Sequence, residues 1–128
     1  MTTNGHPILY SVDLAGCAAL TQFDREEISG IFGSALRAAG ATIVDEVSHA
    51  YPGVGLTCVL ILRESHAVLH TWPETGTVNI DIFSCSPRLN SHAAIGELGR
   101  MFGARQVSVQ EIPRADGHRP ELPSHAGA

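Results

Sequence analysis

Residues 56–83 read LTCVLILRESHAVLHTWPETGTVNIDIF, and this stretch predicts the centre of a β-sheet. Residues 56–62, 67–71 and 77–83 are rich in β-branched and aliphatic side chains, the composition typical of strands. The linking residues 73–76, PETG, contain a proline and a glycine that suit a tight connection. We therefore expect successive strands that form a meander.

The sequence on either side of this stretch predicts two helices. Residues 24–27 have the D-x-x-E pattern of a capping box, and apolar residues then recur at helical spacing as far as Gly40. Residues 91–102 show a second apolar face and end before Gly103. Three further strands are expected, at residues 7–14, 41–48 and 106–112.

These elements predict an α+β fold, a two-layer sandwich in which a mainly antiparallel sheet carries two helices on one face. Each predicted helix ends in Gly-Ala before a strand, which suggests an internal β-α-β pseudo-duplication. A chain of 128 residues has the length of one domain. We place that domain at residues 1–112 and interpret the polar residues 113–128 as a flexible C-terminal tail.

Composition argues against several classes of function. The net charge is -5 and Arg residues form no cluster in the sequence, which disfavours nucleic acids and anionic membranes as partners. No apolar run approaches the roughly 18 residues of a membrane span, and the N-terminal sequence lacks signal-peptide features. We expect a cytoplasmic protein. Three cysteines without a CxxC pair and seven scattered histidines predict neither a disulfide framework nor a metal site.

Residues 63–85 contain side chains that can act as nucleophiles, acids or bases in catalysis. Strand alternation puts His66 and His70 on one face of the sheet and Ser65 on the other. Ser65 is therefore expected at an irregular start of its strand, or to act through its backbone. A serine hydrolase that uses Ser65, His70 and Asp81 is a poor interpretation, because no G-x-S-x-G elbow is present. Inert packing of Cys85 is the other alternative.

The same segment resembles a known family. Residues 64–66 (ESH), 70–74 (HTWPE) and 81–85 (DIFSC) are similar in order and spacing to the signature of prokaryotic S-adenosylmethionine decarboxylases. Looser similarity extends from about Gly5 to Ile112. The resemblance implies a self-processing proenzyme, cleaved between Glu64 and Ser65, in which Ser65 becomes a pyruvoyl group. That cofactor binds the substrate amine as a Schiff base and makes pyridoxal phosphate unnecessary.

The resemblance also assigns catalytic roles. His70 matches the histidine that removes the proton from the Ser65 α-carbon during processing, work that suits an imidazole. Cys85 matches the donor of a proton to the decarboxylated carbon, because an ordinary thiol is protonated at neutral pH. Thr57 stands in the place of a serine that assists processing.

Two more residues match substrate-binding positions. Glu74 corresponds to the acid that holds the ribose hydroxyls, and Tyr51 to an aromatic residue on which adenine stacks. The small-molecule substrate implied by the family is S-adenosylmethionine, whose decarboxylated form is the aminopropyl donor of spermidine synthesis. The family also implies a homodimer of processed two-chain protomers, built on the exposed sheet or its edge, with Tyr51 of one half meeting Ser65 of the other.

Departures from the signature leave the substrate open. Thr75 and Thr77 replace two tyrosines, Asn79 is gained, and residues 62–63, Leu-Arg, replace small residues. The first alternative is a pyruvoyl-dependent decarboxylase of arginine or ornithine. The second is a non-enzymatic binding relative, which the presence of Ser65, His70 and Cys85 disfavours.

Overall fold

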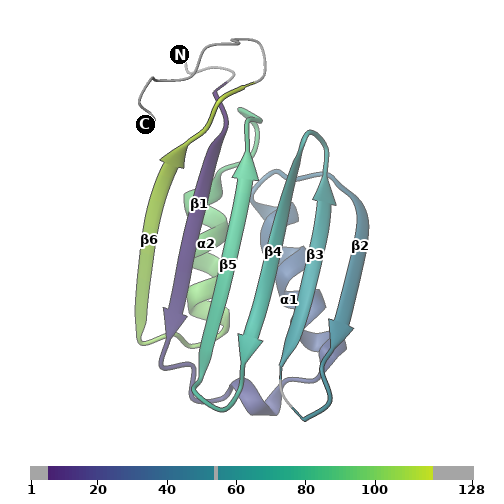
Figure 1. The fold of residues 1–128 in the computed structure, drawn as a ribbon, viewed down its shortest axis with the longest axis vertical. Helices are drawn as coiled ribbons and strands as arrows, with labels where there is room; N and C mark the ends of the chain where they lie inside the picture. Colours follow the sequence, from purple (N-terminus) through teal and green to yellow (C-terminus); the bar gives the residue numbers. More distant parts are fainter. Residues whose placement is uncertain (1–5, 54, 117–128) are drawn as a thin grey trace, which may run out of the picture.

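The computed structural model describes residues 6–53 and 55–116. These residues form one six-stranded antiparallel sheet with strand order β2-β3-β4-β5-β1-β6, and both helices lie behind it in Figure 1. The elements in chain order are β1 (Ile8–Ala15), a 3-10 turn (Leu20–Gln22), α1 (Arg25–Ala38), β2 (Ile43–Ala50), β3 (Leu56–Leu62), β4 (Ser65–Trp72), β5 (Thr77–Ser84), α2 (Ser91–Met101) and β6 (Gln106–Pro113). The predicted α+β sandwich is confirmed.

The strand pairings give the fold two similar β-α-β units. Because every neighbouring pair in the sheet is antiparallel, β1 and β2 run in the same direction, and so do β5 and β6. Helix α1 connects the first pair and α2 connects the second. The predicted internal pseudo-duplication is therefore present in the topology.

The two ends of α1 explain one correct prediction and one error, because β2 begins later than the sequence predicted. Asp24 and Glu27 form the predicted capping box at the start of α1. At the other end, Gly40 has φ +107° and the Ala41 N–H donates to the Leu36 carbonyl at 2.9 Å. This terminating turn uses residues that were predicted to begin a strand, so β2 starts at Ile43 instead of residue 41. At the chain's end, residues 117–128 of the predicted tail lie outside the described residues.

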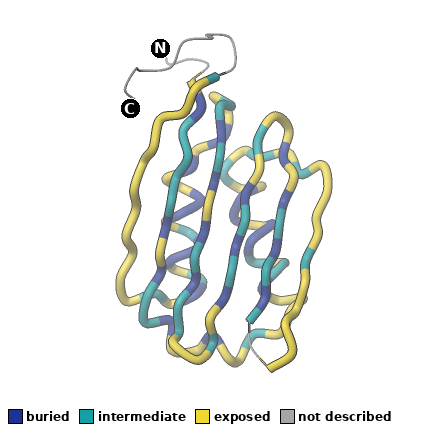
Figure 2. The backbone as a smooth tube through the Cα atoms, in the orientation of Figure 1, coloured by how far each residue is buried: buried dark blue, intermediate teal, exposed yellow. Residues whose placement is uncertain are grey.

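The core lies between the helices and one face of the sheet. Along β3, β4 and β5, every second residue is buried against α1 and α2, and Figure 2 shows this alternation along the central strands. The largest fully buried side chains are Phe32, Phe102, Leu14, Leu20, Leu36, Leu60, Leu69, Ile80, Ile82 and Leu98. This layer fixes which side chains face away from the helices.

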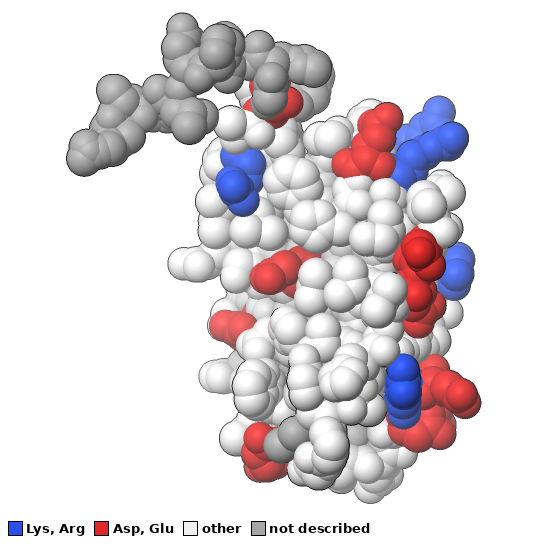
Figure 3. Space-filling view, turned by 45° about the vertical axis from the view of Figure 1, so that its right-hand side comes forward, with Lys and Arg blue, Asp and Glu red and all other residues white. Residues whose placement is uncertain are grey.

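Among the described residues, no helix covers the opposite face of the sheet. Val47, Ile61 and Trp72 lie on this face and expose 59%, 43% and 46% of their surface. Figure 3 shows wide areas of the visible side of the molecule without charged residues. In the part of the chain that the structure describes, neither helix has the length and apolar character needed to cross a bilayer.

Candidate active site

The turn between β3 and β4 places Ser65 at the start of its strand. Leu62 pairs with Ser65, so Arg63 and Glu64 form a two-residue connection. Glu64 has φ +63°, the left-handed conformation that costs a non-glycine residue roughly 1–2 kcal/mol. The Arg63 N–H donates to the Thr42 carbonyl at 3.0 Å and ties the turn to the connection before β2. The peptide before Ser65 is therefore held in a strained conformation.

Ser65 and Cys85 are brought together at this turn. The Ser65 Oγ is buried and has no hydrogen-bond partner among the described residues. The Cys85 thiol donates to the Glu64 carbonyl oxygen, with a sulfur–oxygen distance of 3.5 Å. An unpartnered hydroxyl thus lies next to a carbonyl that a thiol polarises, which is an arrangement suited to acyl transfer.

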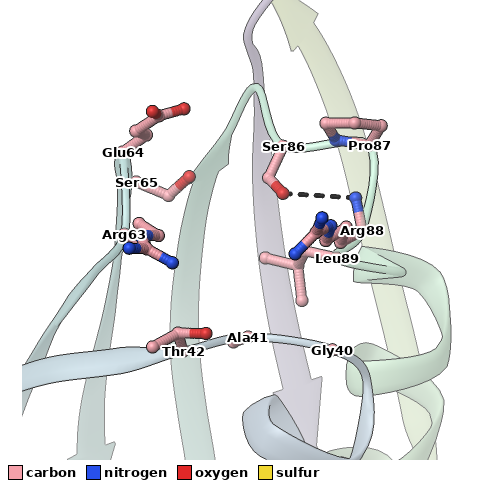
Figure 4. A pocket seen from close by; sticks show the side chains of 10 residues that line it. All are labelled: Gly40, Ala41, Thr42, Arg63, Glu64, Ser65, Ser86, Pro87, Arg88 and Leu89. Atoms are coloured by element: carbon pink, nitrogen blue, oxygen red, sulfur yellow. Dashed lines mark hydrogen bonds between the residues drawn. The ribbon is translucent and has the colours of Figure 1, made fainter.

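A cavity of about 400 Å³ adjoins Ser65. Its walls come from the β3–β4 turn, from the end of α1 and from the segment that links β5 to α2, as Figure 4 shows. Ser86 faces Ser65 across this space, and its Oγ accepts a hydrogen bond from the Arg88 N–H at 3.2 Å. Arg63 and Arg88 also line it.

The other predicted residues form a second group at the opposite end of the sheet. His70 Nδ1 lies 2.8 Å from the Thr57 Oγ1, and that oxygen lies 3.1 Å from the Tyr51 hydroxyl. These three side chains line a mainly apolar pocket of about 410 Å³ together with Trp72. Glu74 is exposed in the β4–β5 turn at the same end. The structure therefore joins Tyr51, Thr57 and His70 into one hydrogen-bonded chain.

Within one chain the two groups do not meet. Ser65 and His70 are five residues apart on β4, which separates their α-carbons by about 16 Å. Ser65 also lies on the helix side of the sheet, whereas His70 lies on the open face, as strand alternation predicted. The hairpin brings Cys85 to Ser65 but leaves His70 at the far end.

Sequence reasoning missed the partners of the second group. The Trp72 indole N–H donates to the Asn79 Oδ1 at 2.6 Å, and the Asn79 amide donates to the Asp13 Oδ1 at 2.7 Å. Asn79 pairs with His70 across the strands. Asn79 was visible as a departure from the family signature, but its connection of Trp72 to Asp13 depends on the register of three strands.

The remaining thiols are remote from this chemistry. Cys17 and Cys58 are buried free cysteines, and burial raises the pKa of both thiols. Both therefore resist ionisation and are poor nucleophiles. In the described ranges, no group of three or more His, Cys, Asp or Glu side chains is placed to hold a metal ion.

Comparisons with known proteins show the family of the chain. The sequence model of the S-adenosylmethionine decarboxylase family matches residues 9–115, and the chain belongs to that family. Its relatives include proteins named S-adenosylmethionine decarboxylase proenzyme. The one from Acidithiobacillus ferrooxidans is 33% identical over 98% of this chain and 92% of its own length. The one from Clostridium tetani is 31% identical over 94% of each chain.

A solved structure shares the fold. The crystal structure of the adenosylmethionine decarboxylase from Aquifex aeolicus superposes with a TM-score of 0.76, at 24% sequence identity. The match covers 88% of this chain and 93% of the other. At this identity the likeness establishes the architecture.

Proposed function

We propose that the chain is a proenzyme that cleaves itself between Glu64 and Ser65 and then decarboxylates S-adenosylmethionine with a pyruvoyl group formed from Ser65. The observation that carries this proposal is the buried, unpartnered Ser65 hydroxyl beside the Glu64 carbonyl, to which Cys85 donates. Family membership and the relatives' name, proenzyme, support it.

The position of Ser65 directly after the Glu64 carbonyl supports self-processing. Its hydroxyl oxygen attacks the Glu64 carbonyl carbon, and the Cys85 thiol stabilises the negative charge that develops on the carbonyl oxygen. The peptide C–N bond breaks, which leaves an ester to Glu64 and a free amino group on residue 65. The left-handed Glu64 conformation adds strain that cleavage releases.

The ester breaks when a base removes the α-proton of residue 65. The Glu64 carboxylate then leaves from the β-carbon, the resulting enamine becomes an imine, and water replaces its nitrogen as ammonia. We assign the base to His70, whose Nδ1 contacts Thr57. The fit of a pyruvoyl group at residue 65 rests on the buried, unpartnered oxygen already present there.

During decarboxylation a pyruvoyl carbonyl supplies the electron sink for the pair of electrons that carbon dioxide leaves behind. Cys85 lies beside residue 64 and provides a proton for the substrate carbon that has lost carbon dioxide. Tyr51 and Trp72 offer exposed aromatic surface beside His70 for a flat ring, and Glu74 offers a carboxylate for a ribose diol.

A complete site requires two copies of the chain. The Ser65 group lies at one end of the sheet and the His70 group at the other. A two-fold axis that runs parallel to the sheet and perpendicular to its strands packs the two open faces together and brings unlike ends into contact. The uncovered face carries exposed apolar residues, including Val47, Ile61 and Trp72, that such pairing would bury. We therefore propose a homodimer in which His70, Tyr51 and Glu74 of one copy complete the Ser65 site of the other.

One observation favours the second candidate, a decarboxylase of arginine or ornithine. At the two positions where the family has tyrosines, the Thr75 hydroxyl donates to the Thr77 hydroxyl at 3.0 Å. These small side chains offer no ring to pack on adenosine. Glu74 serves either substrate, because a carboxylate pairs with a distal cation as well as with a diol.

Intact mass measurement and a substrate panel test the proposal. Purified protein should give one fragment that ends at Glu64 and one that begins with a pyruvoyl-blocked residue 65, and Ser65→Ala should stay whole. Carbon dioxide release should be highest from S-adenosylmethionine among the three candidate substrates. An uncleaved wild-type chain that still decarboxylates would refute the mechanism, whereas preference for arginine or ornithine would change the substrate alone.

A further inference from the structure

Two guanidinium groups converge on the cavity beside Ser65. Arg63 belongs to the β3–β4 turn, and Arg88 belongs to the segment between β5 and α2. Figure 4 shows them on opposite sides of the cavity, with the Ser65 hydroxyl directed into the space between them. The carboxylate of Glu64, the acidic residue in this lining, points away from the cavity in the same view.

The charge of this cavity differs from that of the chain. The net charge of the chain is -5, yet two of its eight basic residues meet here. The ion pairs found among the described residues are His92–Glu111 and Arg100–Glu97, so neither cavity arginine is neutralised by a carboxylate there. The cavity therefore attracts an anionic group.

The candidate substrates have one anionic group in common. In S-adenosylmethionine, arginine and ornithine alike, the α-carboxylate is attached to the carbon that bears the reacting amine. When that amine reaches residue 65, the carboxylate must lie within a few bonds of it and hence beside this cavity. A guanidinium matches the planar geometry of a carboxylate with two parallel hydrogen bonds.

We propose that Arg63 and Arg88 bind the α-carboxylate of the substrate and so determine that the enzyme takes amino acids and releases amines. This inference rests on the proposed decarboxylase function. The carboxylate faces the two guanidinium groups, and the cationic end of the substrate points away from them. Once carbon dioxide has left, the product is a cation without a carboxylate, and the same two arginines repel it. One pair of residues thus favours substrate binding and product release.

Binding to the uncleaved Ser65→Ala chain tests this pair directly. Calorimetry would measure three acid and amine pairs: S-adenosylmethionine with its decarboxylated form, arginine with agmatine, and ornithine with putrescine. For the pair that binds, Arg63→Gln and Arg88→Gln should each weaken the acid by about tenfold or more, the usual effect of losing a charged hydrogen bond. Affinity for the amine should stay the same or rise.

The control is Arg100→Gln, which removes an exposed arginine on α2 outside the cavity and should change neither affinity. Arg88→Lys, which keeps the charge, should recover part of the acid affinity. Sedimentation should show the same assembly for all variants. Three results would overturn the inference: unchanged acid affinity when Arg63→Gln and Arg88→Gln are combined, equal weakening of acid and amine, or failure of every acid to bind.

The same variants separate this inference from the proposed function. With Ser65 present, Arg63→Gln and Arg88→Gln should still be cleaved, with a raised KM for the acid. If wild-type enzyme released carbon dioxide from none of the three acids, the function would be wrong. The acid-against-amine difference in the Ser65→Ala chain would still decide whether the arginines bind a carboxylate.

Discussion

A single hydroxyl connects two candidate site residues, Tyr51 and His70, at the same end of the sheet. The Thr57 Oγ1 lies between the Tyr51 hydroxyl and the His70 Nδ1, at 3.1 and 2.8 Å. A hydroxyl can donate to one neighbour while it accepts from the other, so Thr57 fixes the orientation of the imidazole. When Nδ1 carries the proton and donates to Thr57, the lone pair of the other ring nitrogen, Nε2, is left to act as a base.

Replacement of Thr57 should therefore slow self-processing. We expect Thr57→Val to lower the cleavage rate by about tenfold or more, because a disordered base loses part of the acceleration that a positioned base provides. Thr57→Ser should cleave near the wild-type rate, and Thr21→Val in the 3-10 turn serves as the matched control. Fragments resolved by gel electrophoresis over time give the rates. Equal rates for the valine and serine variants would show that the hydroxyl has no positioning role.

The sequence predicted the side of the sheet on which each candidate residue lies. It was not used to predict the distances between these residues. Alternation correctly put Ser65 opposite His70. The spacing of five residues between Ser65 and His70 would also have predicted their separation of about 16 Å, because the length of a strand follows from its number of residues. Arg63 was visible only as a departure from the signature, and Arg88 gave no signal, because its position at the cavity depends on how the β5–α2 segment packs.

At the scale of elements, the β3–β4 turn holds a conformation that its sequence does not favour. Glu64 occupies the left-handed region, where glycine is usual. In the Ser65→Ala background, Glu64→Gly should raise the free energy of unfolding by up to about 1 kcal/mol. Glu97→Gly inside α2 should instead lower it by about 1 kcal/mol. Urea denaturation at one fixed protein concentration makes the comparison.

Although Glu64→Gly should stabilise the fold, it should slow self-processing. With Ser65 present, Glu64→Gly should be cleaved more slowly than wild type, because the relaxed turn no longer releases strain when the peptide breaks. A glycine variant that is less stable than the glutamate form would show that the turn is unstrained. Faster cleavage would show that strain does not assist processing.

Other element boundaries followed from simple patterns. Strands β3 and β5 were predicted within one residue because their apolar runs are bounded by turn residues. Strand β2 was displaced by two residues, because the glycine-terminated end of α1 continues through Ala41 and Thr42 before the strand begins. Local sequence patterns thus predicted that each of these strands exists, and the terminating turn of α1 determined where β2 starts.

At the scale of the whole molecule, the two ends of one sheet carry the two halves of one proposed site. The Ser65 group faces the helices at one end, and the Tyr51, Thr57 and His70 group faces the open side at the other. No side-chain rotation spans about 16 Å along a strand. If His70 serves Ser65, it must serve the Ser65 of another copy.

Two inactive variants should therefore rescue one another. Ser65→Ala retains His70, and His70→Ala retains Ser65, so a mixed dimer contains one composite site with both residues intact. When the two chains are produced together, the His70→Ala chain should be cleaved after Glu64 while the Ser65→Ala chain stays whole. Either variant produced alone should yield at most trace amounts of the mature fragments.

Tags of different mass on the two chains allow an intact-mass spectrum to identify which chain is cut. A double variant, Ser65→Ala with His70→Ala, mixed with the His70→Ala chain provides the control, because that pair has no histidine to contribute. If only within-chain catalysis operates, co-production would give no cleavage above that control, and the shared site would be excluded.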